Sequence, residues 1–239
     1  TVPSGGKQAN SINLRRNNLA FTNANDTLTL TAGVLMCFPH AEGRQIGTTS
    51  TPGVITTTAP ELFIYDWYNS GGTVTINSKI TGNVMVVLGS DGSTGGTFYF
   101  TNSGNNYTGG TVINGNTSSS PSIQLNSSSG NVFIPNANNP DSGLIINDDA
   151  SVVMSGSAGQ IGSGNKVTMT GSSTLTLYGN NTLAGLNLYV YNSPTVNLGT
   201  TLTLTGGINV YHYNPYYYAK VQTGTLDLNG NNNRSEEHT

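Results

Sequence analysis

One stretch in the middle of the chain decides the fold: Gly104-Asn105-Asn106-Tyr107-Thr108-Gly109-Gly110-Thr111-Val112-Ile113. It joins a run of Gly and Asn, which favour turns, to an alternating Thr-Val-Ile segment, which favours a strand. A degenerate copy follows at Gly179-Asn180-Asn181-Thr182-Leu183-Ala184-Gly185-Leu186-Asn187-Leu188, and another begins at Gly230-Asn231-Asn232-Asn233. A turn-plus-strand unit that recurs in this way indicates a solenoid, in which each unit stacks on the next.

The composition of the whole chain supports a β-rich fold and excludes several other classes. Gly, Asn, Thr and Ser make up about half of the 239 residues, and only 8% of residues are charged. Such a chain lacks the residues of helix bundles, and it has no apolar run long enough for a membrane-spanning helix. The eight Lys and Arg residues give no basic patch for nucleic acid. The net charge of −3 is low for a disordered chain.

Short segments of alternating apolar and Thr or Asn residues recur at intervals of roughly 8 to 13 residues and predict strands. The predicted strands are residues 27–30, 62–65, 73–76, 83–88, 97–101, 111–113, 122–125, 131–134, 143–146, 151–154, 166–170, 174–178, 186–190, 195–198, 201–205, 208–211 and 224–228. Many short strands fit either an antiparallel sandwich or a solenoid. The best hairpin signal, Asn114-Gly115, does not lie between long alternating strands, and this favours the solenoid.

The expected solenoid is a parallel β-helix with three strands per turn and roughly 20 to 30 residues per coil. Inward side chains of each strand would stack on those of the next coil, which suits Thr, Val, Ile and Leu. Gly and Asn would occupy corners where the backbone needs positive φ. Corner Asn side chains would also stack and hydrogen-bond along the axis.

At these residues the chain resembles a known family. Asn105-Asn106-Tyr107-Thr108-Gly109-Gly110-Thr111-Val112 resembles the autotransporter-associated β-strand repeat, whose core is Asn-x-Tyr-Thr-Gly-Gly-Thr followed by an alternating apolar strand. Residues 174–181 and 225–232 resemble a segment that often accompanies this repeat, and residues 71–83 are similar to such passengers. The resemblance implies a right-handed single-stranded parallel β-helix in a large secreted or surface-displayed bacterial protein. Such proteins often carry an outer-membrane barrel or another anchoring signal.

The two ends differ from the middle. Residues 1–11 lack the basic and apolar regions of a signal peptide, so we expect that a signal peptide was removed or that the chain begins inside a longer protein. Arg234-Ser235-Glu236-Glu237-His238-Thr239 breaks the composition and resembles a translated sequencing adapter. We therefore expect a passenger-like region over residues 1–233, best supported over 71–233, and an adapter-derived segment at 234–239.

The sequence predicts no catalytic residues. Asp148-Asp149 comes nearest, because β-helix enzymes that cleave polysaccharides place acidic pairs on one face. Neighbours on a strand point to opposite faces, so the pair is better explained as a turn between Ile146 and Val152. Lys166 is the only downstream basic candidate before Lys220.

Metal and cofactor sites are not predicted either. His40 and His212 are far apart and lack partners at the spacing of zinc ligands. Gly89-Ser90-Asp91-Gly92 is interpreted as a lone turn, because no calcium-binding repeat surrounds it. The single cysteine, Cys37, is predicted to be a small buried hydrophobic residue.

One cluster is the candidate ligand or partner surface. It consists of five tyrosines: Tyr211, Tyr213, Tyr216, Tyr217 and Tyr218. Their rings offer a flat apolar face and a hydrogen-bonding tip, which suits sugar rings or partner proteins. Pro215 indicates that they lie in a loop leaving the coil. The alternative is that the rings cover the solenoid flank or stack on one another. Asp66-Trp67-Tyr68 is a smaller aromatic spot with the same two interpretations.

These features predict a non-catalytic stalk or adhesive passenger segment, secreted or displayed on a bacterial surface. Its expected partners are glycans or host matrix proteins, with no nucleic acid and no transmembrane segment. The alternative is a carbohydrate-active β-helix, either a polysaccharide lyase or a hydrolase. That alternative requires carboxylates or bases from successive coils to meet on one face.

Overall fold

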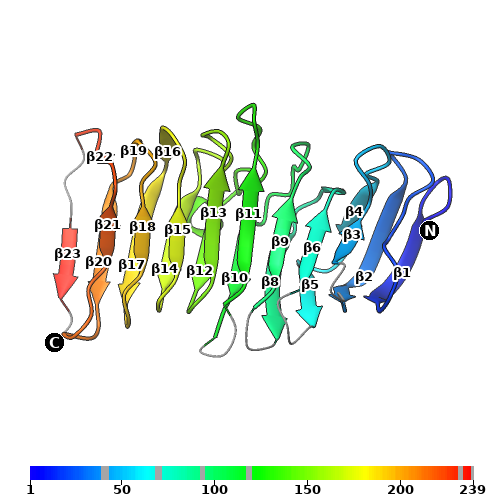
Figure 1. Ribbon diagram of the computed structural model, residues 1–239, viewed down its shortest axis with the longest axis horizontal. Coiled ribbons are helices and arrows are strands. Elements are labelled where there is room, and N and C mark those ends of the chain that lie inside the picture. Colours follow the sequence, from blue (N-terminus) through cyan, green and yellow to red (C-terminus); the bar gives the residue numbers. More distant parts are fainter. Residues whose placement is uncertain (39–42, 68–71, 92–94, 117–119, 231–233, 238–239) are drawn as a thin grey trace.

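The computed structural model describes residues 1–38, 43–67, 72–91, 95–116, 120–230 and 234–237. In this part the regular structure is almost entirely β-strand, with one short 3-10 helix, η1 (Pro140–Ser142). The described residues form no helix that is long and apolar enough to cross a bilayer. The chain winds into a long stack of coils with its two termini at opposite ends (Figure 1).

The strands lie on three sides of the stack, which we call faces A, B and C. Face A contains β1 (Lys7–Leu14), β2 (Thr27–Cys37), β5 (Glu61–Trp67), β8 (Met85–Asp91), β10 (Thr111–Asn114), β12 (Leu144–Asn147), β14 (Lys166–Thr170), β17 (Gly185–Val190), β20 (Ile208–His212) and β23 (Arg234–Glu237). Face B contains β3 (Arg44–Ile46), β6 (Thr73–Ile76), β9 (Thr97–Phe100), β11 (Ser122–Asn126), β13 (Ser151–Ser155), β15 (Thr174–Thr176), β18 (Thr195–Asn197) and β21 (Lys220–Gln222).

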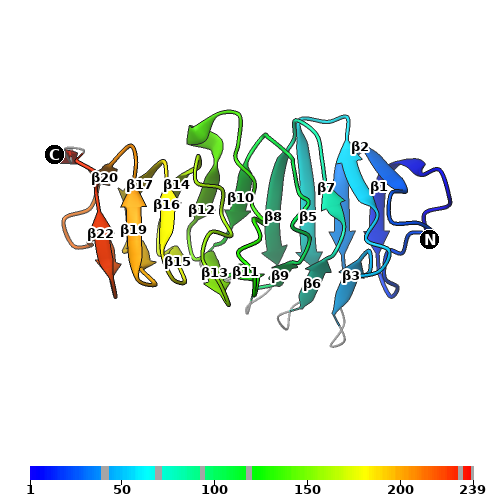
Figure 2. The same cartoon turned by 90° about the horizontal axis from the view of Figure 1, so that it is seen from above.

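Face C connects face B to face A and is less regular. It contains β4 (Val54–Thr57) and β7 (Lys79–Ile80) beside the first half of β2, and β16 (Asn181–Leu183), β19 (Thr201–Leu204) and β22 (Thr225–Asp227) toward the C-terminal end. Figure 2 shows these strands from above. Between the two groups, face C is represented by an isolated bridge between Ile134 and Ile161.

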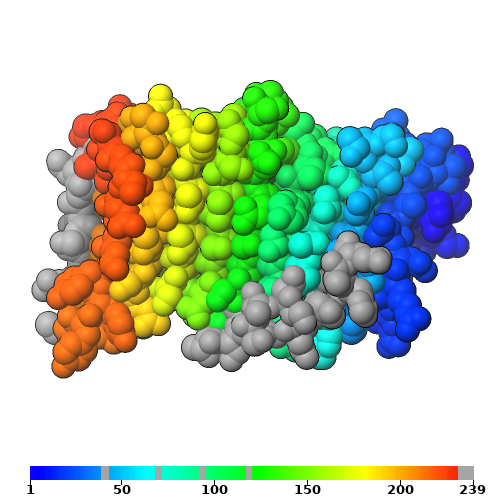
Figure 3. All heavy atoms as spheres, viewed as in Figure 1, coloured from blue at the N-terminus to red at the C-terminus, as the bar shows by residue number. Residues whose placement is uncertain are grey.

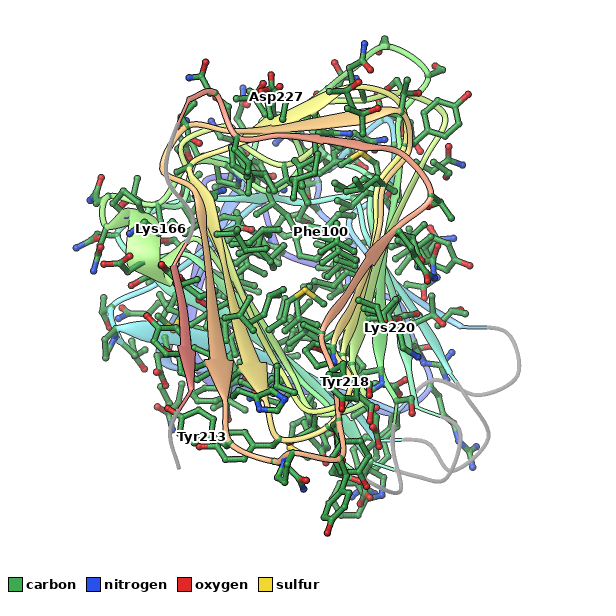
Figure 4. The ribbon with its side chains drawn as sticks, turned by 90° about the vertical axis from the view of Figure 1, so that its left-hand side faces the viewer. Phe100, Lys166, Tyr213, Tyr218, Lys220 and Asp227 are labelled. Carbon is green, nitrogen blue, oxygen red and sulfur yellow. The ribbon has the colours of Figure 1, made fainter. Side chains whose placement is uncertain are left out.

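The strands form a right-handed parallel β-solenoid of about nine turns. Seen from the C-terminal end, the chain climbs along face B, crosses face C at the top and descends along face A toward the viewer (Figures 1 and 4). Coil length varies: Val167 pairs with Leu186, 19 residues later, whereas Thr111 pairs with Leu144, 33 residues later. The long coil contains η1. The parallel arrangement of the strands confirms the predicted parallel β-helix.

Inward side chains stack in columns along the axis and form one continuous core. One column of face A consists of Leu35, Ile64, Leu88, Ile113, Ile146, Met169 and Leu188. One column of face B consists of Val74, Phe98, Ile123, Val152, Leu175 and Val196. All of these side chains are fully buried. Because strands in a sheet lie about 4.8 Å apart, each side chain contacts its equivalents in the coils before and after it.

The stretch that decides the fold leads from face C into β10. Tyr107 is fully buried, and its hydroxyl lies 2.7 Å from the hydroxyl of Thr111. The side-chain oxygen of Asn105 accepts the backbone N–H of Ile80 at 2.9 Å, and its Nδ2 donates to the carbonyl of Phe133 at 3.0 Å. Asn105 therefore links its own coil to the coils on both sides.

Corners are formed mainly by glycine. Among the described residues, 16 glycines have positive φ, whereas the other residues with positive φ are Asp148, Thr223 and Asn229. The expectation that Asn supplies positive φ at corners is therefore wrong, except at Asn229. Asn side chains do hydrogen-bond along the axis, but the pairs lie in strands and not at corners. Asn147 Nδ2 donates to Asn114 Oδ1 at 2.8 Å between the ends of β12 and β10, and Asn209 Nδ2 donates to Asn187 Oδ1 at 2.9 Å between β20 and β17.

Two further predictions need correction. Residues 131–134 form no strand: only Ile134 forms a β-bridge, with Ile161, and the backbone carbonyl of Gln160 accepts hydrogen bonds from the N–H groups of both Phe133 and Ile134. Residues 89–91 are not a turn, because β8 continues through Asp91 and pairs with β5 along its whole length.

Candidate functional site

The tyrosines of the last coils form a stacked ladder, which we call the tyrosine ladder. Tyr189 lies against Tyr211, with ring centroids 4.5 Å apart and planes 16° from parallel. Tyr191 lies against Tyr213 at 4.5 Å and 6°. Tyr189 and Tyr211 are register partners on β17 and β20, so each ring lies on the ring of the preceding coil. For Tyr211 and Tyr213, stacking on other rings is therefore what the structure shows.

The other three predicted tyrosines lie in a loop that leaves the corner between faces A and B. Figure 4 shows Tyr213 and Tyr218 at this lower corner. Tyr216 and Tyr218 are 85% and 65% exposed, and Tyr217 is also exposed. His212 Nε2 donates to the backbone oxygen of Tyr217 at 2.8 Å and so holds the loop against β20. The loop predicted from Pro215 is present, and it exposes aromatic rings.

Sequence reasoning missed Tyr189 and Tyr191. The signal was the pattern Tyr-Val-Tyr at 189–191, which matches Tyr-His-Tyr at 211–213 one coil later. Residues at equivalent positions of successive coils pair in register, so their side chains stack on each other.

A second aromatic group lies on face A near the N-terminal end. The ring centroid of Trp67 is 6.0 Å from that of Phe38 and 6.2 Å from that of Tyr65. The guanidinium of Arg15 lies 5.9 Å from the Phe38 ring centroid. Trp67 is 47% exposed. Its neighbour Tyr68, named with it in the sequence, lies outside the described residues.

Beside this group the outer surface of face A is hollowed. The hollow has a volume of about 220 Å³ and spans β5, β8 and β10. Its outward-facing lining is Phe63, Tyr65, Val87, Gly89 and Asn114, and Asn116, which follows β10, also borders it. These side chains carry no charge.

The acidic pair Asp148-Asp149 lies in a tight turn, as the sequence predicted. The backbone N–H of Ala150 donates to the carbonyl of Asn147 at 3.1 Å, and Asp148 has a φ of 55°. Lys166 forms a 2.6 Å ion pair with Asp141 of η1. The described part of the chain contains no group of three His, Cys, Asp or Glu side chains that could hold a metal ion, and His40 lies outside it.

A polar group lies inside the solenoid near the N-terminal end. Cys37 is fully buried and free, as predicted, and burial raises the pKa of its thiol. Asp66 follows Cys37 in the same inward column and is also fully buried. Neither of its carboxyl oxygens has a hydrogen-bond partner, and burial raises its pKa to about 7. Arg44 donates to the carbonyls of Gly43 and Arg15.

The protein is therefore a parallel β-solenoid that carries exposed aromatic side chains around Trp67 and in the loop of Tyr216 to Tyr218. Comparisons with protein-family models, with curated proteins and with solved structures found no match to this chain.

Proposed function

We propose that this chain is a non-catalytic stalk segment with adhesive surfaces, in a secreted or surface-displayed bacterial protein. The unbroken stack of about nine coils is the observation that carries this proposal. At about 4.8 Å per coil, the stack extends roughly 40 Å along its axis. A solenoid of this kind projects its sides away from an attachment point and repeats the same surface along them.

Exposed aromatic rings support the adhesive part of the proposal. Tyr216 and Tyr218 are exposed in the loop between β20 and β21, and Trp67 is exposed on face A. Aromatic rings with a polar tip are suited to sugar rings and to protein partners. Glycans and host matrix proteins are accordingly the proposed ligands.

The arrangement of acidic groups supports a non-catalytic role over the carbohydrate-active alternative. Cleavage of a polysaccharide needs two groups held on opposite sides of one bond. Asp148 and Asp149 are neighbours within one turn, and Asp141 is paired with Lys166. Figure 3 shows face B, where the side chains of successive strands form parallel ridges.

The adhesive proposal is tested by binding the purified chain to arrays of glycans and matrix proteins. The double variant Tyr216→Ser with Tyr218→Ser should lose at least tenfold in binding to the best ligand. Tyr178→Ser serves as the matched control, because Tyr178 is 50% exposed outside this loop. Absence of binding to every ligand on the arrays, or full binding by the double variant, would count against this adhesive surface.

The non-catalytic part is tested with neutral and acidic polysaccharides. We expect no new reducing ends and no unsaturated products after prolonged incubation. Either product, if abolished by Asp148→Asn or Asp149→Asn, would establish the carbohydrate-active alternative instead.

A further inference from the structure

One row of outward side chains on face A is interrupted at Gly89. Register pairing places Met36, Tyr65, Gly89, Asn114 and Asn147 in this row. A Cβ at Gly89 would lie 3.4 Å from two carbons of the Tyr65 ring, so the ring borders the empty position. The missing side chain creates the hollow of about 220 Å³ between Tyr65 and Asn114.

We propose that this hollow binds one sugar residue of a neutral glycan chain. The proposal rests on the adhesive function proposed above and gives it a site separate from the tyrosine loop. A volume of about 220 Å³ is below the roughly 300 to 1,000 Å³ of sites for drug-sized ligands, so it admits a single ring.

The walls of the hollow have the two chemical properties that a sugar ring requires. Phe63, 41% exposed, and Tyr65 supply aromatic surface for the apolar face of the ring, and Val87 forms the floor. Asn114 supplies an amide on the opposite side. Its Oδ1 accepts a hydrogen bond from Asn147 at 2.8 Å, which fixes the orientation of the amide. The Nδ2 donor of Asn114 is therefore directed away from Asn147.

Charge selects among glycans. The side chains that face the hollow are aromatic, aliphatic or amide groups. A uronate or a sulfated sugar would lose hydration without gaining a cationic partner, whereas a neutral sugar would not. The ligand class is therefore a neutral glycan.

The backbone disfavours a peptide as the occupant. Strand β8 is paired with β5 on one side and with β10 on the other, so an extended peptide finds no open strand edge there. A chain lying along the solenoid axis would instead pass from the hollow over Asn114 to Asn147, one coil further.

The chain contains a single tryptophan, and its ring centroid lies 6.2 Å from that of Tyr65. Fluorescence of Trp67 therefore reports on this part of face A. We expect a saturable change on titration with at least one of cellotetraose, mannotetraose and maltotetraose, and at least tenfold weaker binding of tetragalacturonate. No change with any of the three neutral tetrasaccharides would overturn the proposal.

Two variants locate the response in the hollow. Gly89→Val fills it without backbone strain, because Gly89 lies in β8 with no positive φ. Tyr65→Ala removes one wall. Each should weaken binding at least tenfold, whereas Tyr99→Ala, which removes an exposed ring from face B, should not. Circular dichroism and melting temperature verify that each variant is folded.

The array experiment distinguishes failure of this site from failure of the adhesive function. If a folded Gly89→Val chain keeps the affinity of the parent chain for neutral tetrasaccharides, the site is wrong. Array binding that depends only on Tyr216 and Tyr218 would then leave the adhesive function standing. Neutral tetrasaccharide binding lost in Gly89→Val supports the site, whatever the tyrosine-loop variant shows.

Discussion

Asp66 places a carboxyl group inside the solenoid, between the buried Cys37 and Ser90 of its column. Its carboxyl oxygens have no hydrogen-bond partner, and Arg44, the buried cation whose charge acts on Cys37, donates to backbone carbonyls. Burial raises the pKa of Asp66 to about 7, whereas an unfolded Asp has a pKa near 4. The folded chain therefore holds this proton more tightly than the unfolded chain.

The sign of the pH dependence follows from this difference. Below about pH 4 the carboxyl is neutral in both states, and Asp66 contributes no pH-dependent loss. As pH rises toward 7, the unfolded chain ionises first, and the free energy of unfolding falls by about 4 kcal/mol. Asp66→Asn should remove this loss, so the variant gains stability over the parent chain at pH 8 but not at pH 4.

Urea unfolding at pH 4, 5.5, 7 and 8 measures this effect. Asp148→Asn is the control, because Asp148 is exposed in a turn with positive φ that Asn also accepts. A constant difference between parent chain and Asp66→Asn across this pH range would contradict the buried-acid explanation.

Cys37 gives a second prediction at the same scale. Its side chain is fully buried, which keeps alkylating reagents away from the sulfur. Burial also raises the pKa of the thiol, so little of the reactive thiolate forms. Iodoacetamide should leave Cys37 unmodified in the folded chain and modify it fully in 8 M urea, as judged by mass spectrometry. Rapid labelling under native conditions would mean that this end of the solenoid opens easily.

Sequence reasoning predicted the burial of Cys37 but placed Asp66 only in the aromatic spot with Trp67 and Tyr68, without predicting that its carboxyl is buried. The alternation Leu62, Ile64, Asp66 could have placed its side chain inward, because every second residue of a strand faces the same side. Asp side chains are rarely buried without a partner, but at this position the alternation of the strand determines the burial.

At the scale of the element, the turn before β10 shows why the decisive stretch contains Gly-Gly. Gly110 has a φ of 98°, and a Cβ there would overlap the carbonyl oxygen of Ser142 in the next coil. The position thus requires both a left-handed backbone and the absence of a side chain. Only glycine meets both requirements, and this allows the backbone of the following coil to approach Gly110 closely.

Gly110→Ala should therefore destabilise the chain by about 2 to 4 kcal/mol, from left-handed strain plus overlap with the next coil. Gly159→Ala is the matched control, since Gly159 has a φ of 74° and nothing within 4 Å of its Cβ position. It should lose about 1 kcal/mol from strain alone. Denaturant unfolding compares the two, and equal losses would show that the neighbouring coil moves away at little cost.

Elements with apolar alternation could be predicted well from the sequence, and those without it could not. The predicted strands at 73–76 and 166–170 coincide with β6 and β14. Strand β1 was missed because its sequence, Lys-Gln-Ala-Asn-Ser-Ile-Asn-Leu, is mostly polar. It pairs with β2, so its neighbour stabilises it where its own pattern does not.

At the scale of the whole molecule, the sequence indicated stacked coils but not how coils of different length stay aligned. Coils of 19 and 33 residues keep the same inward column because the extra residues leave the coil at corners, as η1 does. The glycan hollow had no sequence signal of its own. It depends on Tyr65, Gly89 and Asn114 sharing one row, which only the register reveals.

A stack in which each coil contacts only its neighbours should open from its ends. Strand β11 lies between β9 and β13, whereas β21 pairs with β18 alone among the described strands. Inward residues of β11 are fully buried, but Val221 of β21 and Leu226 of β22 are only half-buried.

Amides of β21 and β22 should therefore exchange with deuterium at least tenfold faster than those of β11. Mass spectrometry of peptic fragments measures this gradient, with β6 as a second internal reference because β3 and β9 flank it. Uniform exchange would mean that the coils open together, and a stalk built from them would then fail as a single unit under load and not by loss of its outermost coil.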